Sequence, residues 1–221
     1  MLVIGIDACP HGRWAVVALR NGEYEAATTL DDFRTVLTAF SAADIVAVDI
    51  PIGFPLPSSW PRAADVAARE FLGRERKSSV FLTFPREVYE ATSHGEAVKL
   101  ARRLVNVGIS IQSYCLGPRM LEADRRLVGR VYEVHPEVSF RKLAERDLPS
   151  KKTAQGRAER RACLTRAGIA LPERLPRATE GDLLDAAVSA WTAGRIARGE
   201  AVTLPTAPPS DDRGRSVAIW Y

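Results

Sequence analysis

The sequence of 221 residues is poor in cysteine, and its few cysteines are badly placed for cross-linking. Cys9, Cys115 and Cys163 are odd in number, lie far apart and form no Cys-x-x-Cys pair. Disulfide-rich and zinc-binding domains depend on even-numbered or closely spaced cysteines. We therefore expect neither a disulfide framework nor a structural zinc site, and a reducing cytoplasm is the expected compartment.

The sequence also shows no pattern typical of a leader segment, a membrane span or an internal repeat. The N-terminus has no basic region and carries Asp7 within its first apolar run, so neither a signal peptide nor a membrane-spanning helix is expected. With 46% hydrophobic and 26% charged residues, the composition is that of an ordinary globular protein. This length suits one well-buried core, and we expect a single domain over 1–221.

Charge is unevenly distributed along the chain. Residues 1–50 contain 3 basic and 7 acidic side chains, a net charge of −4, whereas the whole chain carries +4. The remainder therefore carries +8. An acidic opening that could hold metal, followed by a basic remainder, fits an anionic partner such as nucleic acid. Basic residues that only solvate helices would produce the same balance.

The opening of the chain has the pattern of an antiparallel meander. Apolar runs predict strands at Leu2–Asp7 and Trp14–Leu19. Asn21-Gly22 is a strong hairpin signal and predicts a third strand at Glu23–Thr29. We therefore expect three consecutive antiparallel strands.

A helix and a buried strand follow the meander. Apolar residues recur at helical spacing in Leu30–Phe40, and Asp31 or Asp32 can cap its start. Ile45–Asp49 is a continuous apolar run, as expected of a central strand covered on both faces. Because such crossovers are right-handed, this strand is predicted beside the first one and parallel to it.

The rest of the chain reads as an insertion followed by further strands and helices. A proline-rich loop opens the insertion at about 51–129, which is expected to form a mostly helical lid over the carboxylates. The whole pattern predicts an α/β fold with a mixed sheet, antiparallel at its start and parallel later. The predicted elements are a basic helical stretch at Ala63–Arg126 with breaks at Thr83-Phe84-Pro85 and Gly117-Pro118, a strand at Arg130–Val134, helices at Val138–Leu143, Lys151–Ala167 and Asp182–Arg198, and an edge strand at Val217–Tyr221.

Two predicted strands end in an aspartate, and a later helix carries two more. Asp7 and Asp49 would lie at the same edge of the sheet, and Asp182 and Asp185 share one helix face. Carboxylates that share a site repel one another unless cations are present. The pattern therefore predicts two Mg²⁺ or Mn²⁺ ions held by Asp7, Asp49 and Asp185, with Asp182 as a further ligand, in a site for phosphoryl transfer.

Each of these aspartates also has a purely structural interpretation. Asp7 and Asp49 could cap the turns that follow their strands. Thr179 to Asp182 could form a capping arrangement at the start of the last helix, where acidic residues are favoured in any case. Asp185 lies deeper in that helix and is the preferred ligand of the two.

A third group of candidates follows the predicted strand at Arg130–Val134. Glu133 and His135 alternate onto one face of the strand, and Glu137 comes just after Pro136. They are candidates for an outer metal ligand and a proton shuttle. The alternative is a hydrogen-bonded strand end.

Two basic stretches are candidates for substrate contact. A solvated helix face would have a similar composition, so both interpretations stay open. The Lys-Ser-Ser stretch adds hydroxyl groups to its charge and is the better candidate, with Lys77 and Ser78 expected to face the carboxylates. The candidates are Arg76, Lys77, Ser78 and Ser79 in the first stretch and Lys152 and Arg157 in the second, where Lys151, Arg160 and Arg161 are also basic.

Five ordered motifs together resemble a known family. The strand order and acidic residues resemble the ribonuclease H-like superfamily, and the motifs resemble its domain of unknown function 429 family, whose members are described as predicted nucleases. That resemblance runs nearly end to end and implies a metal-dependent nuclease. The motifs are Gly5-Ile6-Asp7-Ala8-Cys9, Asp49-Ile50-Pro51-Ile52-Gly53, Lys77-Ser78-Ser79-Val80-Phe81, Glu133-Val134-His135-Pro136-Glu137 and Asp182-Leu183-Leu184-Asp185-Ala186.

The leading prediction is therefore a divalent-metal-dependent nuclease acting on DNA or RNA. A nucleotide-binding phosphotransferase of the actin and sugar-kinase type is the first alternative, because that group also opens with Gly-Ile-Asp. Those proteins use two such domains and glycine-rich phosphate loops, and this sequence has no second copy. A non-catalytic module that binds nucleic acid or a metabolite is the second alternative.

Overall fold

The structure is a computed structural model that describes residues 1–127, 129–211 and 213–221. The chain forms two compact units. Unit 1 comprises Met1–Asp49, Val128–Val202 and Trp220–Tyr221, and unit 2 comprises Ile50–Leu127 and Thr203–Ile219. Most of the insertion predicted at about 51–129 belongs to unit 2, while Val128, near its predicted end, lies outside the described residues.

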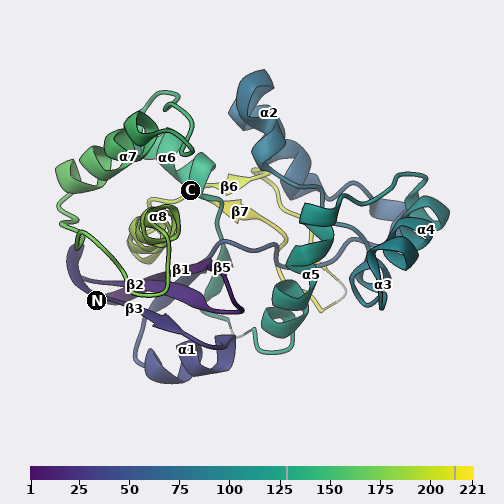
Figure 1. Ribbon diagram of the computed structural model, residues 1–221, viewed down its shortest axis with the longest axis horizontal. Coiled ribbons are helices and arrows are strands. Elements are labelled where there is room, and N and C mark those ends of the chain that lie inside the picture. Colours follow the sequence, from purple (N-terminus) through teal and green to yellow (C-terminus); the bar gives the residue numbers. More distant parts are fainter. Residues whose placement is uncertain (128, 212) are drawn as a thin grey trace. The chain divides into compact units, whose positions relative to one another are not determined.

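Unit 1 is built on a five-stranded mixed sheet with the strand order β3-β2-β1-β4-β5 (Figure 1). β1 pairs antiparallel with β2, and β2 pairs antiparallel with β3. β4 runs parallel to both β1 and β5. The predicted mixed sheet, with the first strand between the second and the fourth, is therefore confirmed. The strands are β1 (Leu2–Ala8), β2 (Trp14–Arg20), β3 (Glu23–Leu30), β4 (Ile45–Val48) and β5 (Val131–Glu133).

The crossover between β3 and β4 runs through α1 (Phe33–Ala39), which is shorter than the helix predicted at Leu30–Phe40. Leu30 still pairs with Trp14 as the last residue of β3, so the helix begins later. Of the two predicted caps Asp32 is the one used, because its carboxylate accepts a hydrogen bond from the Thr35 backbone N–H at 2.7 Å. Phe33 packs on Trp14 with ring centroids 5.3 Å apart and fastens α1 to the sheet.

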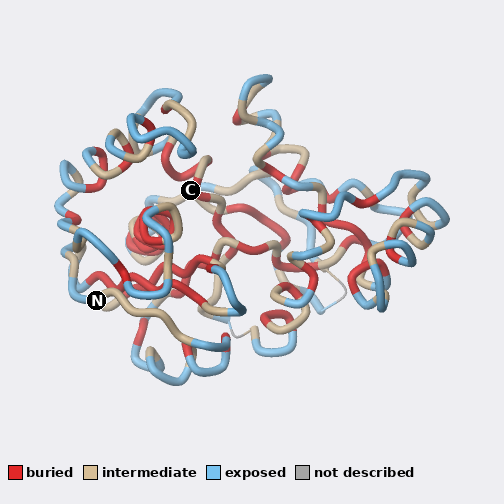
Figure 2. The backbone as a smooth tube through the Cα atoms, viewed as in Figure 1, coloured by how far each residue is buried: buried red, intermediate tan, exposed pale blue. Residues whose placement is uncertain are grey.

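Helix α8 (Glu180–Ala197) lies directly against the sheet and is buried over most of its length (Figure 2). Gly5 in β1 permits this contact. A Cβ atom at Gly5 would lie 2.0 Å from the Ala190 nitrogen and 2.1 Å from the Ala186 carbonyl oxygen. Because Gly5 is two residues from Asp7, the same contact brings the first half of α8 to the acidic end of β1.

Two other helices of unit 1 differ from their predicted boundaries. α6 (Pro136–Ala144) begins at Pro136, because proline is tolerated in the first turn of a helix. α7 (Ala154–Arg166) begins three residues later than predicted, because the Thr153 hydroxyl caps it by accepting a hydrogen bond from the Gly156 N–H at 3.0 Å. Lys151 and Lys152 therefore lie in a turn before the helix.

Unit 2 is largely helical. Its last long helix runs without interruption through Gly117-Pro118, where we predicted a break. That prediction is wrong because tertiary packing outweighs the lost backbone hydrogen bond, and a Cβ at Gly117 would lie only 2.9 Å from the Tyr89 ring. The elements of unit 2 are η1 (Pro57–Ser59), α2 (Ala63–Arg76), η2 (Lys77–Ser79), α3 (Arg86–Tyr89), α4 (His94–Val105) and α5 (Ile111–Asp124), and β6 (Thr203–Leu204) pairs with β7 (Ile219–Trp220), whose last residue belongs to unit 1.

Buried ion pairs hold the helices of unit 2 together. The side chains of Arg62 and Asp65 are 3% and 1% exposed and form an ion pair, and Asp65 also accepts a hydrogen bond from the Thr83 N–H. At the end of α5, the buried Asp124 carboxylate pairs with three arginines. Because two of these, Arg213 and Arg215, belong to the C-terminal segment, the network ties that segment to the helices.

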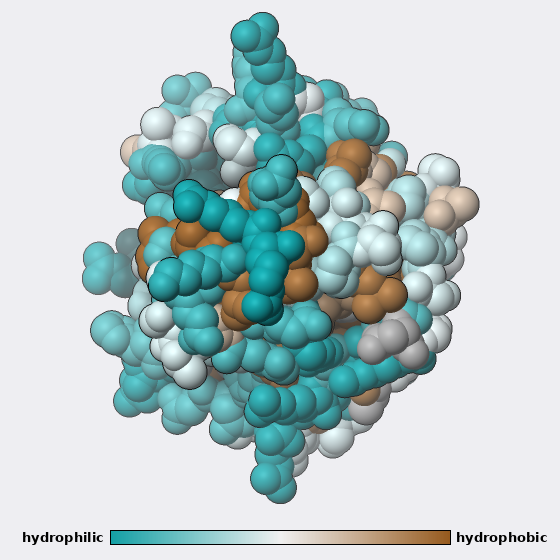
Figure 3. Space-filling view, turned by 90° about the vertical axis from the view of Figure 1, so that its right-hand side faces the viewer, coloured by the Kyte–Doolittle hydropathy of each residue, from teal (hydrophilic) through white to brown (hydrophobic). Residues whose placement is uncertain are grey.

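The face shown in Figure 3 is mainly hydrophilic. On the face shown in Figure 3, hydrophobic surface appears between long hydrophilic side chains. Leu56 is the most exposed of the large apolar side chains of unit 2, at 62%. Within residues 1–127, 129–211 and 213–221, no helix combines the length and the apolar character needed to cross a membrane.

Candidate carboxylate site

Three of the predicted aspartates of unit 1 form one acidic cluster. Asp7 lies near the end of β1, Asp49 follows β4 directly, and Asp185 lies in the second turn of α8. The Asp49 backbone N–H donates to the Ile6 carbonyl at 2.9 Å, which holds Asp49 beside β1. Asp7 and Asp185 are buried, with exposed fractions of 8% and 2%.

Burial makes ionisation of these carboxyl groups costly. Burial raises the pKa of Asp7 well above its usual value, and the charges of Asp49 and Asp185 raise it further. Burial also raises the pKa of Asp49 to about 7, although the Lys151 ammonium and a side-chain hydrogen bond with Asp7 oppose the rise. The pKa of Asp185 is likewise raised by burial, against the lowering effect of Lys151. The cluster therefore needs positive charge to be fully ionised.

Lys151 supplies positive charge to the cluster. Its Nζ lies 2.5 Å from Oδ2 of Asp185 and donates a hydrogen bond to it. Burial alone would lower the pKa of Lys151, but the charges of Asp185, Asp49 and Asp7 outweigh burial and raise it. Lys151 is therefore a cation that is paired directly with Asp185 and acts on the charges of Asp49 and Asp7.

The turn that carries Lys151 is fixed to α7. The Arg160 guanidinium donates to the Pro149 carbonyl at 2.6 Å and forms a two-pronged ion pair with Glu137. Arg157 donates to the carbonyls of Lys151 and Lys152. At Gly156, a Cβ atom would lie 2.0 Å from the Ser150 carbonyl oxygen, so the turn packs directly on the helix backbone.

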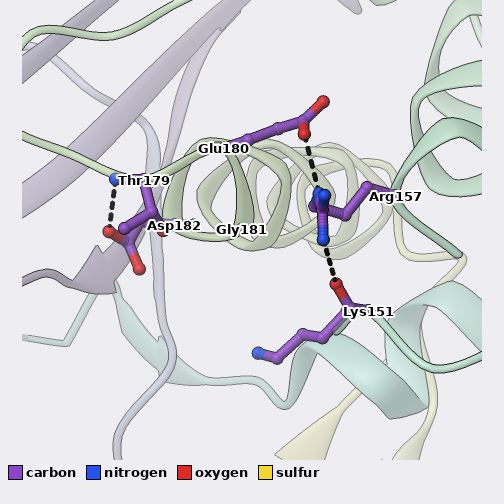
Figure 4. Close-up of a pocket in the computed structure, with 6 residues that line it drawn as sticks. All are labelled: Lys151, Arg157, Thr179, Glu180, Gly181 and Asp182. Atoms are coloured by element: carbon purple, nitrogen blue, oxygen red, sulfur yellow. Dashed lines mark hydrogen bonds and ion pairs between the residues drawn. The ribbon is translucent and has the colours of Figure 1, made fainter. Parts of the chain in front are cut away.

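A pocket of about 460 Å³ opens beside this turn and the start of α8 (Figure 4). In Figure 4 Arg157 bridges Glu180 and the Lys151 carbonyl, while the Lys151 side chain extends away from Arg157. Lys151 thus lines the pocket and contacts Asp185, which connects the pocket to the carboxylates. The pocket is lined by Lys151, Arg157, Thr179, Glu180, Gly181 and Asp182.

Asp182 has the structural role that we gave as its alternative. The Thr179 hydroxyl accepts from the Asp182 N–H at 3.2 Å, and the Asp182 carboxylate accepts from the Thr179 N–H at 2.7 Å. These two bonds form a capping box. The charge of Asp182 still raises the pKa of Asp7 slightly, but one of its oxygens is already used by the cap.

The other candidates of unit 1 lie around the cluster. Glu133 is buried at the end of β5, opposite Val48 and thus next to the strand end that carries Asp49. His135 occupies the N-cap position of α6, after the end of the strand. Glu137 is paired with Arg160. Its charge also raises the pKa of Asp49 and of Asp185, but less than burial does. The roles of Glu133 and His135 as outer ligand and proton shuttle stay predictions.

The predicted substrate-contact residues fall into both units. In unit 2, Arg76 ends α2, Lys77 to Ser79 form η2, and the Ser79 hydroxyl donates to the Arg76 carbonyl at 2.8 Å. In unit 1, Lys152 is exposed, whereas Arg157 is occupied by Glu180 and by the turn before α7. The predicted orientation of Lys77 and Ser78 toward the carboxylates stays a prediction.

The described residues contain no ready-made metal site. No three His, Cys, Asp or Glu side chains among them converge closely enough to hold a metal ion. One atom of the cluster is nevertheless suited to binding a cation, because Oδ1 of Asp185 is buried without a hydrogen-bond partner. Buried carboxylate oxygens without a partner are costly, and a cation would satisfy this one.

Sequence reasoning missed Lys151 as a member of the site. We interpreted it as part of a basic helix starting at residue 151, where a solvated side chain is the usual outcome. The sequence feature that could have revealed this is Thr153, because threonine is a favoured N-cap residue. A helix capped by Thr153 begins at Ala154 and leaves Lys151 in the preceding turn. Its contact with Asp185, 34 residues away, depends on tertiary packing.

A mixed sheet of this order with flanking helices is consistent with the ribonuclease H-like fold, with acidic residues at the ends of two adjacent strands. The chain belongs to the family described as Protein of unknown function (DUF429), whose model matches residues 5–210. Neither the curated proteins nor the solved structures include a match to it. The family predicted from the five motifs is confirmed.

Proposed function

We propose that this protein hydrolyses phosphodiester bonds of nucleic acid with the help of Mg²⁺ or Mn²⁺ at Asp7, Asp49 and Asp185. The observation that carries the proposal is the buried, unpartnered Oδ1 of Asp185 in a cluster with the buried carboxyl group of Asp7 and the partly buried one of Asp49. Such a group of acids is costly for the fold and is most simply explained by a cation that it binds.

The chain's own residues would have distinct tasks in this reaction. Asp7, Asp49 and Asp185 would hold the ion, which when bound supplies concentrated positive charge to the phosphate oxygens. Lys151 reaches the cluster from the pocket side and would attract the phosphate group of a substrate. Asp182 is left out of the ligand set because it caps α8.

The proposed partner is nucleic acid, and the proposed location is the cytoplasm. The net charge of +8 beyond residue 50 supports an anionic polymer as the partner. Cys9, Cys115 and Cys163, all within the described residues, form no disulfide, which is compatible with a reducing compartment. A phosphotransferase is less favoured because the sequence lacks glycine-rich phosphate loops.

Cleavage assays test this proposal. Labelled single-stranded, duplex and branched DNA and RNA are incubated with the wild-type protein and with Asp7→Asn, with Mn²⁺ or with a chelator. We expect cleavage by the wild type in Mn²⁺ and at least a hundredfold loss in Asp7→Asn, which removes a ligand charge without removing volume. Asp31→Asn is the control, because Asp31 is 78% exposed and belongs to the same unit.

Equal cleavage by the wild type and Asp7→Asn would assign the activity to another site or to a contaminant. Binding of nucleic acid without cleavage of any substrate would favour the non-catalytic module. The control variant Asp31→Asn must cleave at the wild-type rate, since only then can a loss in Asp7→Asn be assigned to the carboxylate site.

A further inference from the structure

We propose that Lys151 serves as a fixed cation of the carboxylate site, so that the site takes one divalent ion instead of the two that the sequence suggests. This inference rests on the proposed function. The contact of Lys151 with Asp185 is observed in the structure and does not depend on a bound metal ion.

The first argument is the contact between Lys151 and Asp185. Their 2.5 Å ion pair uses Oδ2 of Asp185, while Oδ1 of the same carboxylate is left without a partner. The carboxylate therefore has one oxygen for the lysine and one for a metal ion. In two-metal sites, shared carboxylates bridge two ions about 3.5–4 Å apart, and here the lysine already takes one of the two positions.

The second argument is charge. Asp7, Asp49 and Asp185 are three carboxyl groups with up to three negative charges, and the ammonium of Lys151, which is paired with Asp185, offsets one of them. One divalent ion then neutralises the remaining charge of these three aspartates, so they do not require a second ion. The neighbouring Glu137 does not change this count, because Arg160 is paired with it.

The third argument is that the lysine is held in place by its backbone. Arg160 donates a hydrogen bond to the Pro149 carbonyl, and Arg157 donates to the carbonyls of Lys151 and Lys152. Gly156 has no side chain, which allows the turn to pack against the backbone of α7. The Thr153 hydroxyl also donates to the Ser150 carbonyl at 2.8 Å. A turn fixed at four points presents Lys151 to the aspartates without a separate ordering step.

The same position gives Lys151 access to a substrate. Its side chain is 46% exposed and lines the pocket beside the start of α8. A lysine ammonium has three donors, so the Lys151 ammonium could hold Asp185 and a phosphate oxygen at once. It would then place positive charge where a second metal ion would otherwise place it.

The test counts Mn²⁺ ions on the full chain by calorimetric titration and by electron paramagnetic resonance. A single Mn²⁺ gives an isolated-ion signal, whereas two ions that share carboxylates couple magnetically. We expect one ion for the wild type and for Lys151→Arg, which keeps the charge, and two ions for Lys151→Met. Lys142→Met, which removes the same charge from an exposed position of unit 1, is expected to bind one ion.

The outcomes separate this inference from the proposed function. Two ions on the wild type, one ion on Lys151→Met, or two ions on Lys142→Met would overturn the role of Lys151 and leave a metal site in place. No ion on any variant would overturn the metal site itself and the inference with it. If circular dichroism shows that Lys151→Met does not fold, the wild-type count decides, because one ion supports the inference and two overturn it.

Discussion

The carboxyl groups of Asp7, Asp49 and Asp185 are harder to ionise in the folded chain than in the unfolded one, because folding removes them from water and brings them together. Lys151 reduces this cost without removing it. The fold is consequently less stable with an empty, ionised cluster than with a protonated one. Stability and metal binding are coupled at these residues.

This coupling has a definite direction with pH. The folded pKa of Asp49 is about 7 and its ordinary value is 3.8, so between these values the folded chain binds protons that the unfolded chain has released. The contribution of Asp49 to the free energy of unfolding therefore falls as pH rises from about 4 through 7, and the raised pKa of Asp7 acts in the same direction. A divalent ion would reverse the loss.

We expect Asp7→Asn to flatten this pH dependence. Without metal, the variant should be more stable than the wild type at pH 8 by about 1–3 kcal/mol, with little difference at pH 4. Urea unfolding in a chelating buffer at both pH values measures the effect. Identical pH profiles for the two proteins would contradict the raised pKa of Asp7.

Among the elements, the contact of α8 with β1 determines where Asp185 lies. The backbones touch at Gly5, which leaves no space for a side chain between them. Two residues further along β1 is Asp7, so the same contact that packs the helix also assembles the acidic cluster. The glycine of the Gly-Ile-Asp motif therefore has a packing role that is separate from any chemistry.

Gly5→Ala tests this packing role. The added methyl group would force α8 away from the sheet, and we expect a loss of about 3 kcal/mol of stability together with weaker Mn²⁺ binding. Gly129→Ala is the matched control in unit 1, because a Cβ atom there meets nothing within 4 Å and the expected change is within about 0.5 kcal/mol. Equal melting temperatures for Gly5→Ala and the wild type would show that the helix can shift freely.

The elements also show what the sequence could predict and what it could not. Strand-length apolar runs, one hairpin signal and the handedness of crossovers are local rules, and they predicted the sheet and the ends at which Asp7 and Asp49 lie. The same residue types serve as caps and as ligands, so Asp182 could not be assigned before its bonds with Thr179 were known. Lys151 reaches Asp185 only because α7 and α8 pack together, and no local pattern contains that information.

At the scale of the whole molecule, chemistry and charge are divided between different parts of the chain. The acidic cluster and its lysine belong entirely to unit 1, whereas the Lys-Ser-Ser stretch belongs to unit 2. Unit 2 has its own buried ionic networks, around Asp65 and around Asp124. The chain therefore combines a group of carboxylates on a five-stranded mixed sheet with a helical unit that carries basic residues.

The most direct measurement of the central claim is the anomalous difference map of a crystal soaked in Mn²⁺. We expect one peak for Mn²⁺ at about 2 Å from Oδ1 of Asp185 and from a carboxyl oxygen of Asp7 or Asp49. The peak should disappear in Asp7→Asn crystals treated in the same way. Saturating Mn²⁺ without anomalous density at these three aspartates would contradict the metal site and the nuclease proposal that depends on it.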